Sequence, residues 1–319
     1  MTSVNVPGRV PPTGGARDPR SPVDDGPPVE RWRNRDKWAA IAFLTPNVLL
    51  FSLFVVLPVI GGVGLSFFSW NLMDDPRFIG LDNYARLFSD QRAISSLGRT
   101  LAFTIGGVVP TVALGFVSAS LINIRMRGIE VIRTFYYMPL VISFAASAVL
   151  WSWVFSPSRG LMNWVLSLIG IQGPAWLSST TWALPSLIVI LIWLSLPLVT
   201  LLYLAALQGI SEEVIEASRL DGAGPLRRLI HITFPMVRNA TVLVTVVMML
   251  AFAFGSFDLV QILTEGGPLR STDILVYYMF DMAFVQLNMG YASTLAVFQF
   301  VVIFGITGTL LYFNRRTEN

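Results

Sequence analysis

A polar segment between two long apolar stretches holds the residues of this chain with the most specific chemistry. It reads EASRLDGA from Glu216 to Ala223 and closes at Pro235. The segment is charged, contains a glycine hinge and is bounded by prolines. The stretches on both sides are apolar enough for a lipid bilayer. A polar segment between them therefore predicts an element that lies in water and contacts a partner there.

The remaining composition excludes most reaction chemistry. The chain has no cysteine, and His231 is its only histidine, which excludes disulfides, thiolate chemistry and histidine-cluster metal sites. The sequence also lacks the GxxxxGK[ST] phosphate loop and the HExxH and GxSxG motifs. We therefore expect no catalytic residue, no metal and no cofactor in this chain. An integral-membrane enzyme is the weakest alternative, and a secondary transporter would show inverted repeats or an ion relay, which are not found.

Local signals give the polar segment a shape. Ser211 suits a helix N-cap, and the two glutamates after it suit the first turn. Gly222 suits the left-handed turn that ends such a helix. Pro225 fits the first turn of a second helix, which would carry His231 on its surface and run towards Pro235. The sequence thus predicts helix, glycine hinge, helix over 209–236, against the alternative of a solvated loop.

The elements on either side are apolar enough to cross a membrane. Hydrophobic residues make up 54% of the 319 residues and charged residues 13%, roughly half the usual charged fraction. Backbone groups in hydrocarbon must bond within their own segment, so the long apolar runs should be helices. We predict an all-α polytopic membrane protein with six transmembrane helices, at Trp38–Phe68, Leu97–Ile124, Val131–Phe155, Trp182–Leu207, Val237–Leu263 and Met289–Phe313.

Residues 1–30 differ from the rest of the chain. They are rich in proline, glycine, arginine and aspartate and poor in apolar residues, so they should form a disordered tail. They lack the apolar core of a cleavable signal peptide, so the first span should be retained. Residues 31–319 are expected to form the six-helix membrane domain.

Basic residues near the span ends predict the orientation. One side carries 13 of them: Arg31, Arg33, Arg35, Lys37, Arg125, Arg127, Arg133, Arg219, Arg227, Arg228, Arg238, Arg315 and Arg316. The other side carries 6: Arg77, Arg86, Arg92, Arg99, Arg159 and Arg270. The richer side should be cytoplasmic, which places both termini (N-in/C-in) and the polar segment there. The basic residues flank spans and form no patch, which argues against nucleic acid as a partner.

Two expectations concern the opposite, outer side. Six aromatic residues near outer span ends suggest an interfacial belt: Tyr84, Trp176, Trp182, Tyr277, Tyr278 and Tyr291. Asp281 should lie in an outer loop, and the sequence assigns it no role.

The pattern EAxxxDGA followed by IxxP at Ile232–Pro235 strongly resembles the "EAA" signature of ABC importer permeases. The chain departs from it at Ser218, usually alanine, and at Leu229, usually aromatic. FIGLDNY from Phe78, LTEGGP from Leu263 and GYAS from Gly290 resemble outer segments of the larger, maltose-type member of a permease pair. The resemblance implies the type I importer permease fold and a coupling helix that docks on an ATPase, with these residues in the contact: Glu216, Ala217, Ser218, Asp221, Gly222, Ala223 and Pro235.

The resemblance also implies partners and a location. These are a second permease subunit forming a heterodimer, two cytoplasmic ATP-binding subunits that bind ATP and Mg, and an extracytoplasmic solute-binding protein. The chain would be a multi-pass protein of the bacterial plasma membrane. Its cargo would be a sugar, a di- or oligosaccharide. The rival cargo is glycerol 3-phosphate, but no predicted span has an arginine near its middle to favour an anion.

Candidate cargo contacts lie in the fourth and fifth spans. Trp193 and Ser195 come from the fourth. The fifth supplies Phe252, Ser256, Asp258 and Gln261. Ser195, Phe252 and Ser256 align with positions that line the translocation cavity in maltose-type permeases. The alternatives are that the aromatic residues only pack and that the serines bond their own helix. Asp258 could equally be an acid that water reaches at the end of its span.

Overall fold

The computed structural model describes residues 29–123 and 127–316, without the side chains of residues 29–36. The predicted tail at 1–30 therefore falls almost entirely outside the described residues, although Val29 already begins a helix. Contacts divide the chain into two units, Met1–Pro58 and Val59–Asn319. Each unit is considered by itself.

The first described stretch of the chain is helical and is apolar from Trp38 onwards. Helix α1 spans Val29–Phe51 and leads through a π turn at Ser52–Val56 into α2, Leu57–Leu65. The continuous stretch Lys37–Leu65 has a mean hydropathy of 2.6, and none of its most apolar window is buried within the chain. A helix that is apolar all round with no covered face suits hydrocarbon surroundings.

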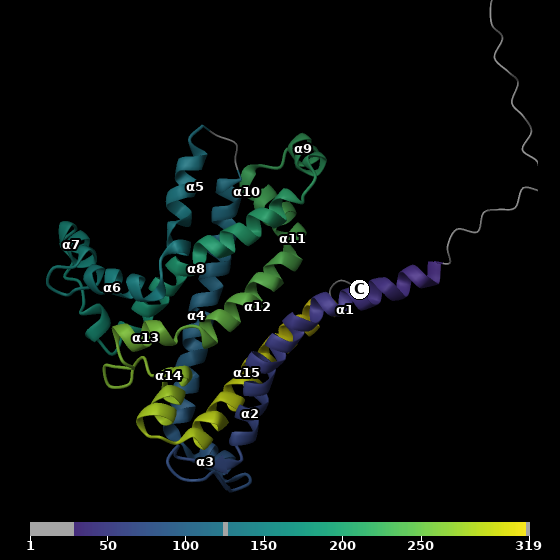
Figure 1. Ribbon diagram of the computed structural model, residues 1–319. Helices are drawn as coiled ribbons and strands as arrows, with labels where there is room; N and C mark the ends of the chain where they lie inside the picture. The colour runs from purple at the N-terminus through teal and green to yellow at the C-terminus, as the bar shows by residue number, and fades with distance from the viewer. Residues whose placement is uncertain (1–28, 124–126, 317–319) are drawn as a thin grey trace, which may run out of the picture. The chain divides into compact units, whose positions relative to one another are not determined.

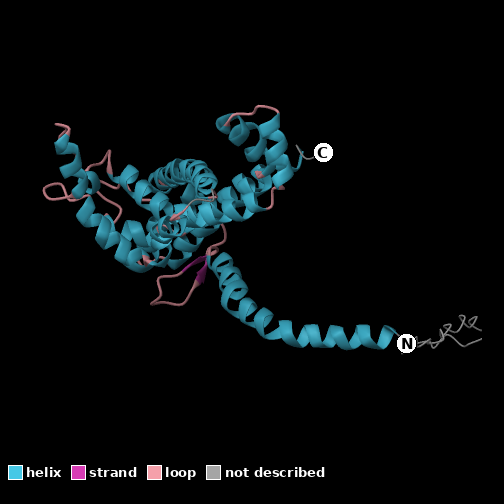
Figure 2. Cartoon of the chain, turned by 90° about the horizontal axis from the view of Figure 1, so that it is seen from above, coloured by secondary structure: helices cyan, strands magenta, loops and turns pink. Residues whose placement is uncertain are grey.

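The second unit opens with a short hairpin and a capped helix. Strands β1, Phe68–Ser69, and β2, Arg77–Phe78, pair antiparallel (Figure 2). Helix α3 spans Asp82–Ser89. The Asp90 carboxylate then accepts the backbone N–H groups of Arg92 and Ala93 and so caps α4, Gln91–Ile122.

The predicted third span is not one straight helix. Helix α5, Ile129–Tyr137, continues as a 3₁₀ turn at Met138–Val141, and α6 covers Phe144–Val154 after a 107° bend. Pro139 has no backbone N–H to continue the α5 ladder, and extended Ile142 separates the two parts. Ser143 then caps α6 through its hydroxyl, 3.3 Å from the Ala146 N–H.

A single long helix forms the fourth predicted span. After α7, Leu161–Leu168, and a 3₁₀ turn at Trp176–Ser178, α8 covers Ala183–Gln208 without interruption at Pro197. Helix α4 likewise continues through Pro110. Membrane helices tolerate an interior proline because neighbouring groups can satisfy the freed carbonyl.

The polar segment forms short helices before the fifth predicted span. Its elements are α9, Glu212–Leu220, α10, Pro225–Arg228, a π turn at Leu229–Thr233, and α11, Phe234–Met236. The predicted fifth span is α12, Arg238–Phe254, followed by α13, Phe257–Leu263, with a break at Gly255 and Ser256. The axis bends by 74° between Pro225–Met236 and Arg238–Phe254.

The chain finishes with a loop and the last long helix. Helix α14, Leu275–Phe280, leads into a π turn at Asp281–Val285, and α15 runs from Met289 to Arg316. Among the described residues, four helices are long and apolar enough to cross a membrane, and up to six segments qualify if each of the two bent pairs counts as one. The four correspond to the first, second, fourth and sixth predicted spans.

Helix α4 lies at the centre of the core of the second unit (Figure 1). Buried residues of α4, α8 and α12 form the main cluster, with contributions from α6 and α13. A second cluster joins α3 and the start of α4 to α14 and α15. Figure 1 shows α9 and α10 at one end of this unit and α3 and α14 towards the other.

Candidate functional site

Helix α9 ends in the left-handed glycine turn that the sequence predicts. Gly222 has φ of 73°. Its N–H bonds the carbonyl of Arg219 at 3.1 Å, and the N–H of Ala223 bonds the carbonyl of Ser218 at 3.0 Å. These two bonds are the pattern of a Schellman C-cap, which satisfies carbonyls that a helix end leaves free. Ser211 takes the predicted N-cap position, but its side chain makes no capping bond.

One face of this element is covered by the protein and the other is open. Ser218 is buried, and its hydroxyl donates to the carbonyl of Ile215 at 2.6 Å. Leu229 packs against the main core cluster. The open face carries Leu220 and Leu226, whose side chains are 89% and 69% exposed. The other predicted docking residues, Glu216, Ala217, Asp221, Gly222 and Pro235, are exposed, and Ala223 is half-buried.

The second helix of the element reaches the core through an aromatic chain. It is longer than α10 alone, because the π turn at Leu229–Thr233 continues it into α11. The wide turn lies directly before Pro235, where a normal α-helical bond to the proline is impossible. The Phe234 ring packs edge-on against Phe116 of α4 at 5.2 Å, and Phe116 packs against Tyr203 of α8 at 5.6 Å. His231 is exposed, as predicted for a surface residue.

The six predicted pathway residues differ in burial within this chain. Phe252 and Ser256 are fully buried, and the Ser256 hydroxyl donates to the carbonyl of Phe252 at 2.8 Å. Trp193 is half-buried and packs edge-on against Trp151 at 5.6 Å. The three others differ in exposure: Ser195 and Gln261 are half-buried and Asp258 is exposed. For Ser256 the structure shows the bond to its own helix that the sequence left as an alternative.

The break between α12 and α13 has a partner on α15 that the sequence did not reveal. The fully buried Gln299 donates from its side-chain amide to the carbonyl of Ala253 at 2.7 Å. Ala253 lies just before the break at Gly255. A broken helix in a membrane protein leaves carbonyls without their usual donors, and a buried amide can replace them. Gln299 therefore ties α15 to the segment that carries the predicted pathway residues.

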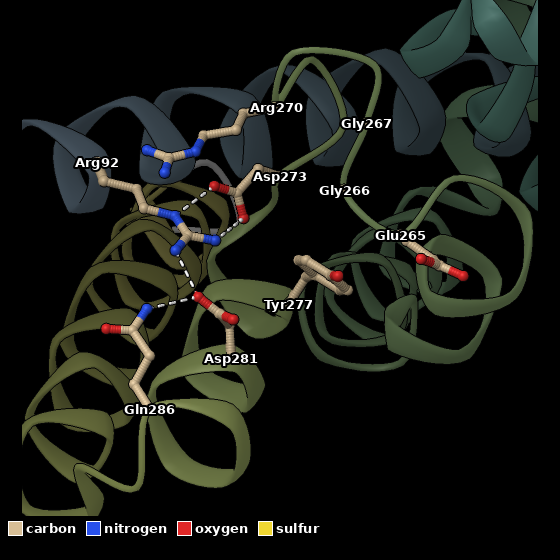
Figure 3. Close-up of a pocket in the computed structure, with 9 residues that line it drawn as sticks. All are labelled: Arg92, Glu265, Gly266, Gly267, Arg270, Asp273, Tyr277, Asp281 and Gln286. Carbon is tan, nitrogen blue, oxygen red and sulfur yellow. Dashed lines mark hydrogen bonds and ion pairs between the residues drawn. The ribbon is translucent and has the colours of Figure 1, made fainter.

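A charged network at the α14 end of the unit is the largest feature that sequence reasoning missed. The Arg92 guanidinium binds both oxygens of Asp273, at 2.7 and 3.2 Å, and also donates to Asp281 (Figure 3). Gln286 donates to the same Asp281 carboxylate at 2.9 Å. Asp273 is 1% exposed, so its charge depends on Arg92. Asp281, to which the sequence gave no role, is thus a member of an ion-pair network.

Asp90 forms the other half of this network. One of its carboxylate oxygens accepts the hydroxyls of Tyr278 and Tyr291, both at 2.6 Å. Burial raises the pKa of Asp90, but these bonds and the N–H groups of Ala93 and Arg92 outweigh it and hold the pKa below its ordinary value. The prediction of an aromatic belt was wrong for Tyr278 and Tyr291, which are 4% and 0% exposed. Their hydroxyl groups bond the carboxylate of Asp90 inside the protein.

A cavity of about 320 Å³ adjoins the network. Arg92, Asp273, Asp281 and Gln286 form one side of it, and Glu265, Arg270 and Tyr277 contribute the rest of its side-chain lining (Figure 3). We call it the Arg92 cavity. None of the six predicted pathway residues lines it.

Residues 111–319 match the family described as the binding-protein-dependent transport system inner membrane component. The chain belongs to this family. The permease is 33% identical over 279 residues to the probable ABC transporter permease protein YurN of Bacillus subtilis, covering 86% of this chain and 95% of that one. It is 31% identical over 284 residues to the sulfoquinovosyl glycerol transport system permease protein SmoG of Agrobacterium fabrum, covering 88% and 92%.

A solved structure agrees with this family in fold. The permease superposes with a TM-score of 0.78 on a chain of a bacterial ABC transporter involved in the import of the acidic polysaccharide alginate. The two chains are 24% identical, and the match covers 90% of this chain and 99% of that one. The resemblance seen at Glu216–Pro235 is thus confirmed at the level of family and fold: the chain is a membrane-spanning ABC importer permease.

Proposed function

We propose that this permease carries a sugar into the bacterial cytoplasm by alternating access driven by a separate ATPase. It would pair with a second permease subunit, and two cytoplasmic subunits would bind ATP and Mg. An extracytoplasmic solute-binding protein would deliver the cargo. The α9–α10 side of the chain would face the cytoplasm, as the distribution of basic residues predicts.

The observation that best supports this proposal is the open face of α9 and α10. Two leucines, Leu220 and Leu226, are largely exposed beside the carboxylates Glu216 and Asp221. An apolar centre with a polar rim suits a protein–protein contact. The ATPase is the partner that the family supplies for such a face, since this chain has no phosphate-binding loop of its own.

The contacts behind that face give docking a route into the membrane helices. Leu229 packs on the core, and Phe234 contacts Phe116, which in turn contacts Tyr203. A displacement of α9 and α10 by the ATPase would therefore be transmitted to α4 and α8 through packed side chains. Packed cores transmit displacement because they have few voids to absorb it. Two conformations of the permease would thus be coupled to the state of the ATPase.

A sugar is the cargo class that we favour. SmoG is named for sulfoquinovosyl glycerol transport and the solved transporter for alginate import, and both names support a carbohydrate. We propose a di- or oligosaccharide that passes the half-exposed polar residues Trp193, Ser195 and Gln261 and the exposed Asp258. The pathway would be completed by the second permease subunit. Glycerol 3-phosphate remains the competing cargo.

The test uses the whole transporter, reconstituted in proteoliposomes with its ATPase and binding protein. Gly222→Val places a β-branched residue at φ of 73°, which costs at least about 1–2 kcal/mol. We expect a loss of ATP-driven sugar uptake of about tenfold or more, since that cost depopulates the turn by a similar factor.

Gly224 supplies the matched control within the same turn. Its φ is −63°, and an added Cβ would meet no atom within 4 Å. Gly224→Ala should therefore transport like the wild type. Normal uptake by Gly222→Val in an assembled complex would refute the docking role of the turn. Uptake of glycerol 3-phosphate in place of every sugar offered would overturn the cargo class but keep the docking role.

A further inference from the structure

The Arg92 cavity has the size and the openness of a small binding site. Its volume is about 320 Å³, near the lower end of the range of about 300–1,000 Å³ that is typical of ligand pockets. This space suits one sugar unit and not a long oligosaccharide. Figure 3 shows the side chains of Arg92, Asp273, Asp281 and Gln286 gathered on one side of the Tyr277 ring.

The charged groups on that side are fixed before any ligand arrives. Arg92 is held at once by Asp273 and Asp281, and Asp281 also accepts from Gln286. The loop opposite is held as well, because the Thr272 hydroxyl bonds the Gly267 carbonyl and the Thr264 hydroxyl, both at 2.8 Å. Planar polar groups with fixed orientation lose little entropy when they bind a ligand.

Several polar groups at the cavity have no partner within the described part of the chain. The guanidinium of Arg270, the carboxylate of Glu265 and the hydroxyl of Tyr277 line the cavity and form no hydrogen bond or ion pair with another described residue. Burial and the carboxylates of Asp281, Glu265 and Asp273 raise the pKa of Tyr277, so its hydroxyl remains a donor. Donors and acceptors are thus both available beside one aromatic ring, which is the combination that ring hydroxyls and C–H faces of a sugar require.

The balance of charge favours a neutral ligand. Arg92 and Arg270 contribute two positive charges, and Glu265, Asp273 and Asp281 contribute three negative charges, which leaves one net negative charge at the cavity. Arg92 is already neutralised by its two carboxylates. An anion would therefore find mainly Arg270 to attract it and would be repelled by the rest.

The Tyr277 ring also connects the cavity to the predicted pathway. It stacks on Phe257 at 6.5 Å with an interplanar angle of 26°. Phe257 begins α13 and lies between Ser256 and Asp258 in the chain. A ligand on the Tyr277 ring would thus be connected, through Tyr277 and Phe257, to the segment that carries Ser256 and Asp258.

We propose that the Arg92 cavity is a receiving subsite that holds one neutral sugar unit of the cargo at the outer side, before the cargo enters the pathway. This inference rests on the proposed function for its direction of transport. Tyr277 would supply the platform, and Asp281 and Arg270 would bind hydroxyl groups. Binding there needs neither ATP nor the coupling turn.

The absence of native cysteine provides a direct test. Gln286→Cys introduces a single thiol at an exposed position on the rim of the cavity, and a membrane-impermeant maleimide can label it in cells that express the whole transporter. Glucose, maltose and trehalose serve as neutral probes and glycerol 3-phosphate as the anionic one. At a sugar concentration of about four times Kd, labelling should slow about fivefold, because only the empty fraction reacts.

Three further variants sharpen the result. Asp75→Cys, exposed in the β1–β2 hairpin loop, should label at the same rate with and without sugar. Adding Tyr277→Ala to Gln286→Cys should remove protection, whereas adding Tyr277→Phe should keep it. Adding Gly222→Val, which we expect to reduce uptake, should leave protection intact and so separates this subsite from the transport mechanism.

Two outcomes overturn the proposal. Labelling of Gln286→Cys that no neutral sugar slows would show that the cavity binds none of them. Equal protection by glycerol 3-phosphate would show that an anion is accepted and that the charge argument is wrong. If sugars protect the thiol but the wild type imports no sugar, the proposed function fails and the subsite stands.

Discussion

At the scale of single residues, Asp90 is the centre of the outer network. Its carboxylate caps α4 and accepts the hydroxyls of Tyr278 and Tyr291 at 2.6 Å. The guanidinium groups of Arg86 and Arg92 lie over the rings of Tyr291 and Tyr278, at 3.9 and 4.1 Å from their centres. One carboxylate thus joins α4, α14 and α15, so its charge state should matter to stability.

We expect the network to lose stability in acid. The pKa of folded Asp90 lies below the ordinary value of 3.8, so its stabilisation is complete above that value and is lost as the pH falls through the folded pKa. Thermal unfolding of the whole complex in detergent between pH 3 and 7 measures this loss. Asp90→Asn should be less stable at pH 7 and should show a weaker loss below pH 4 than the wild type. Parallel pH curves would contradict the assignment.

Tyr291→Phe isolates one bond of the same network. It removes a hydroxyl bonded to a carboxylate and leaves the buried ring in place, which should cost about 1.5–3 kcal/mol of stability. Tyr312→Phe is the control, because Tyr312 is 54% exposed. Chemical unfolding of the two variants should differ clearly. Equal stabilities would mean that the Tyr291 hydroxyl contributes nothing.

At the scale of elements, two glycines let α4 lie close to its neighbours. A Cβ at Gly107 would lie 1.9 Å from Cε1 of Phe252 in α12, and one at Gly115 would lie 2.3 Å from Val199 in α8. Small residues at such seams allow membrane helices to approach closely. Gly107 leaves room for the ring of Phe252, a predicted pathway residue, which is fully buried.

Gly107→Ala should therefore destabilise the permease by about 1–3 kcal/mol through overpacking. Gly98→Ala, also in α4, should be neutral, because its Cβ would meet nothing within 4 Å. Thermal stability of the purified complex measures both. Phe252→Leu added to Gly107→Ala should restore part of the loss, and a double variant no better than Gly107→Ala would show that the ring is not the obstacle.

Local elements were predictable where their signals are local. Gly222 and Pro225 lie three residues apart and define their turn without help from elsewhere, so the helix–hinge–helix shape followed from the sequence. The prediction of a single helix for the third span was wrong. The sequence contains Pro139 there, but a proline alone does not show whether a membrane helix is kinked or broken. Pro110 and Pro197 lie inside unbroken helices.

The outer network could not be predicted, because its partners are far apart in the chain. Arg92 and Asp273 are separated by 181 residues, and Asp90 and Tyr291 by 201. Sequence showed only an arginine near a span end and a tyrosine at a membrane boundary, and both suit interfacial roles. Only the fold reveals that the tyrosine hydroxyl meets a carboxylate.

At the scale of the whole molecule, the two proposed contact sites lie at different ends of the second unit. Helices α9 and α10 lie at one end, and α14, which carries Tyr277 of the Arg92 cavity, lies towards the other (Figure 1). The predicted orientation puts the first in the cytoplasm and the second outside. Single cysteines can measure this orientation, since the chain has none of its own.

We expect Asp75→Cys to react with an impermeant maleimide in intact cells and Glu216→Cys to react only after the membrane is opened. Both residues are exposed in this chain, and the permease is expressed without its ATPase so that docking does not cover Glu216. Labelling followed by gel shift is sufficient. Reaction of Glu216→Cys in intact cells would reverse the topology and remove the docking proposal with it.

The bond from Gln299 to the Ala253 carbonyl has a consequence for motion. The donor is one amide on α15, and the acceptor is one carbonyl beside the α12–α13 break. A slip of α15 by one helical turn, about 5.4 Å along its axis, would stretch this 2.7 Å bond beyond the range of a hydrogen bond. The bond therefore fixes the register between α15 and α12. Whatever rearrangement moves cargo, α15 and the end of α12 should travel as one rigid body.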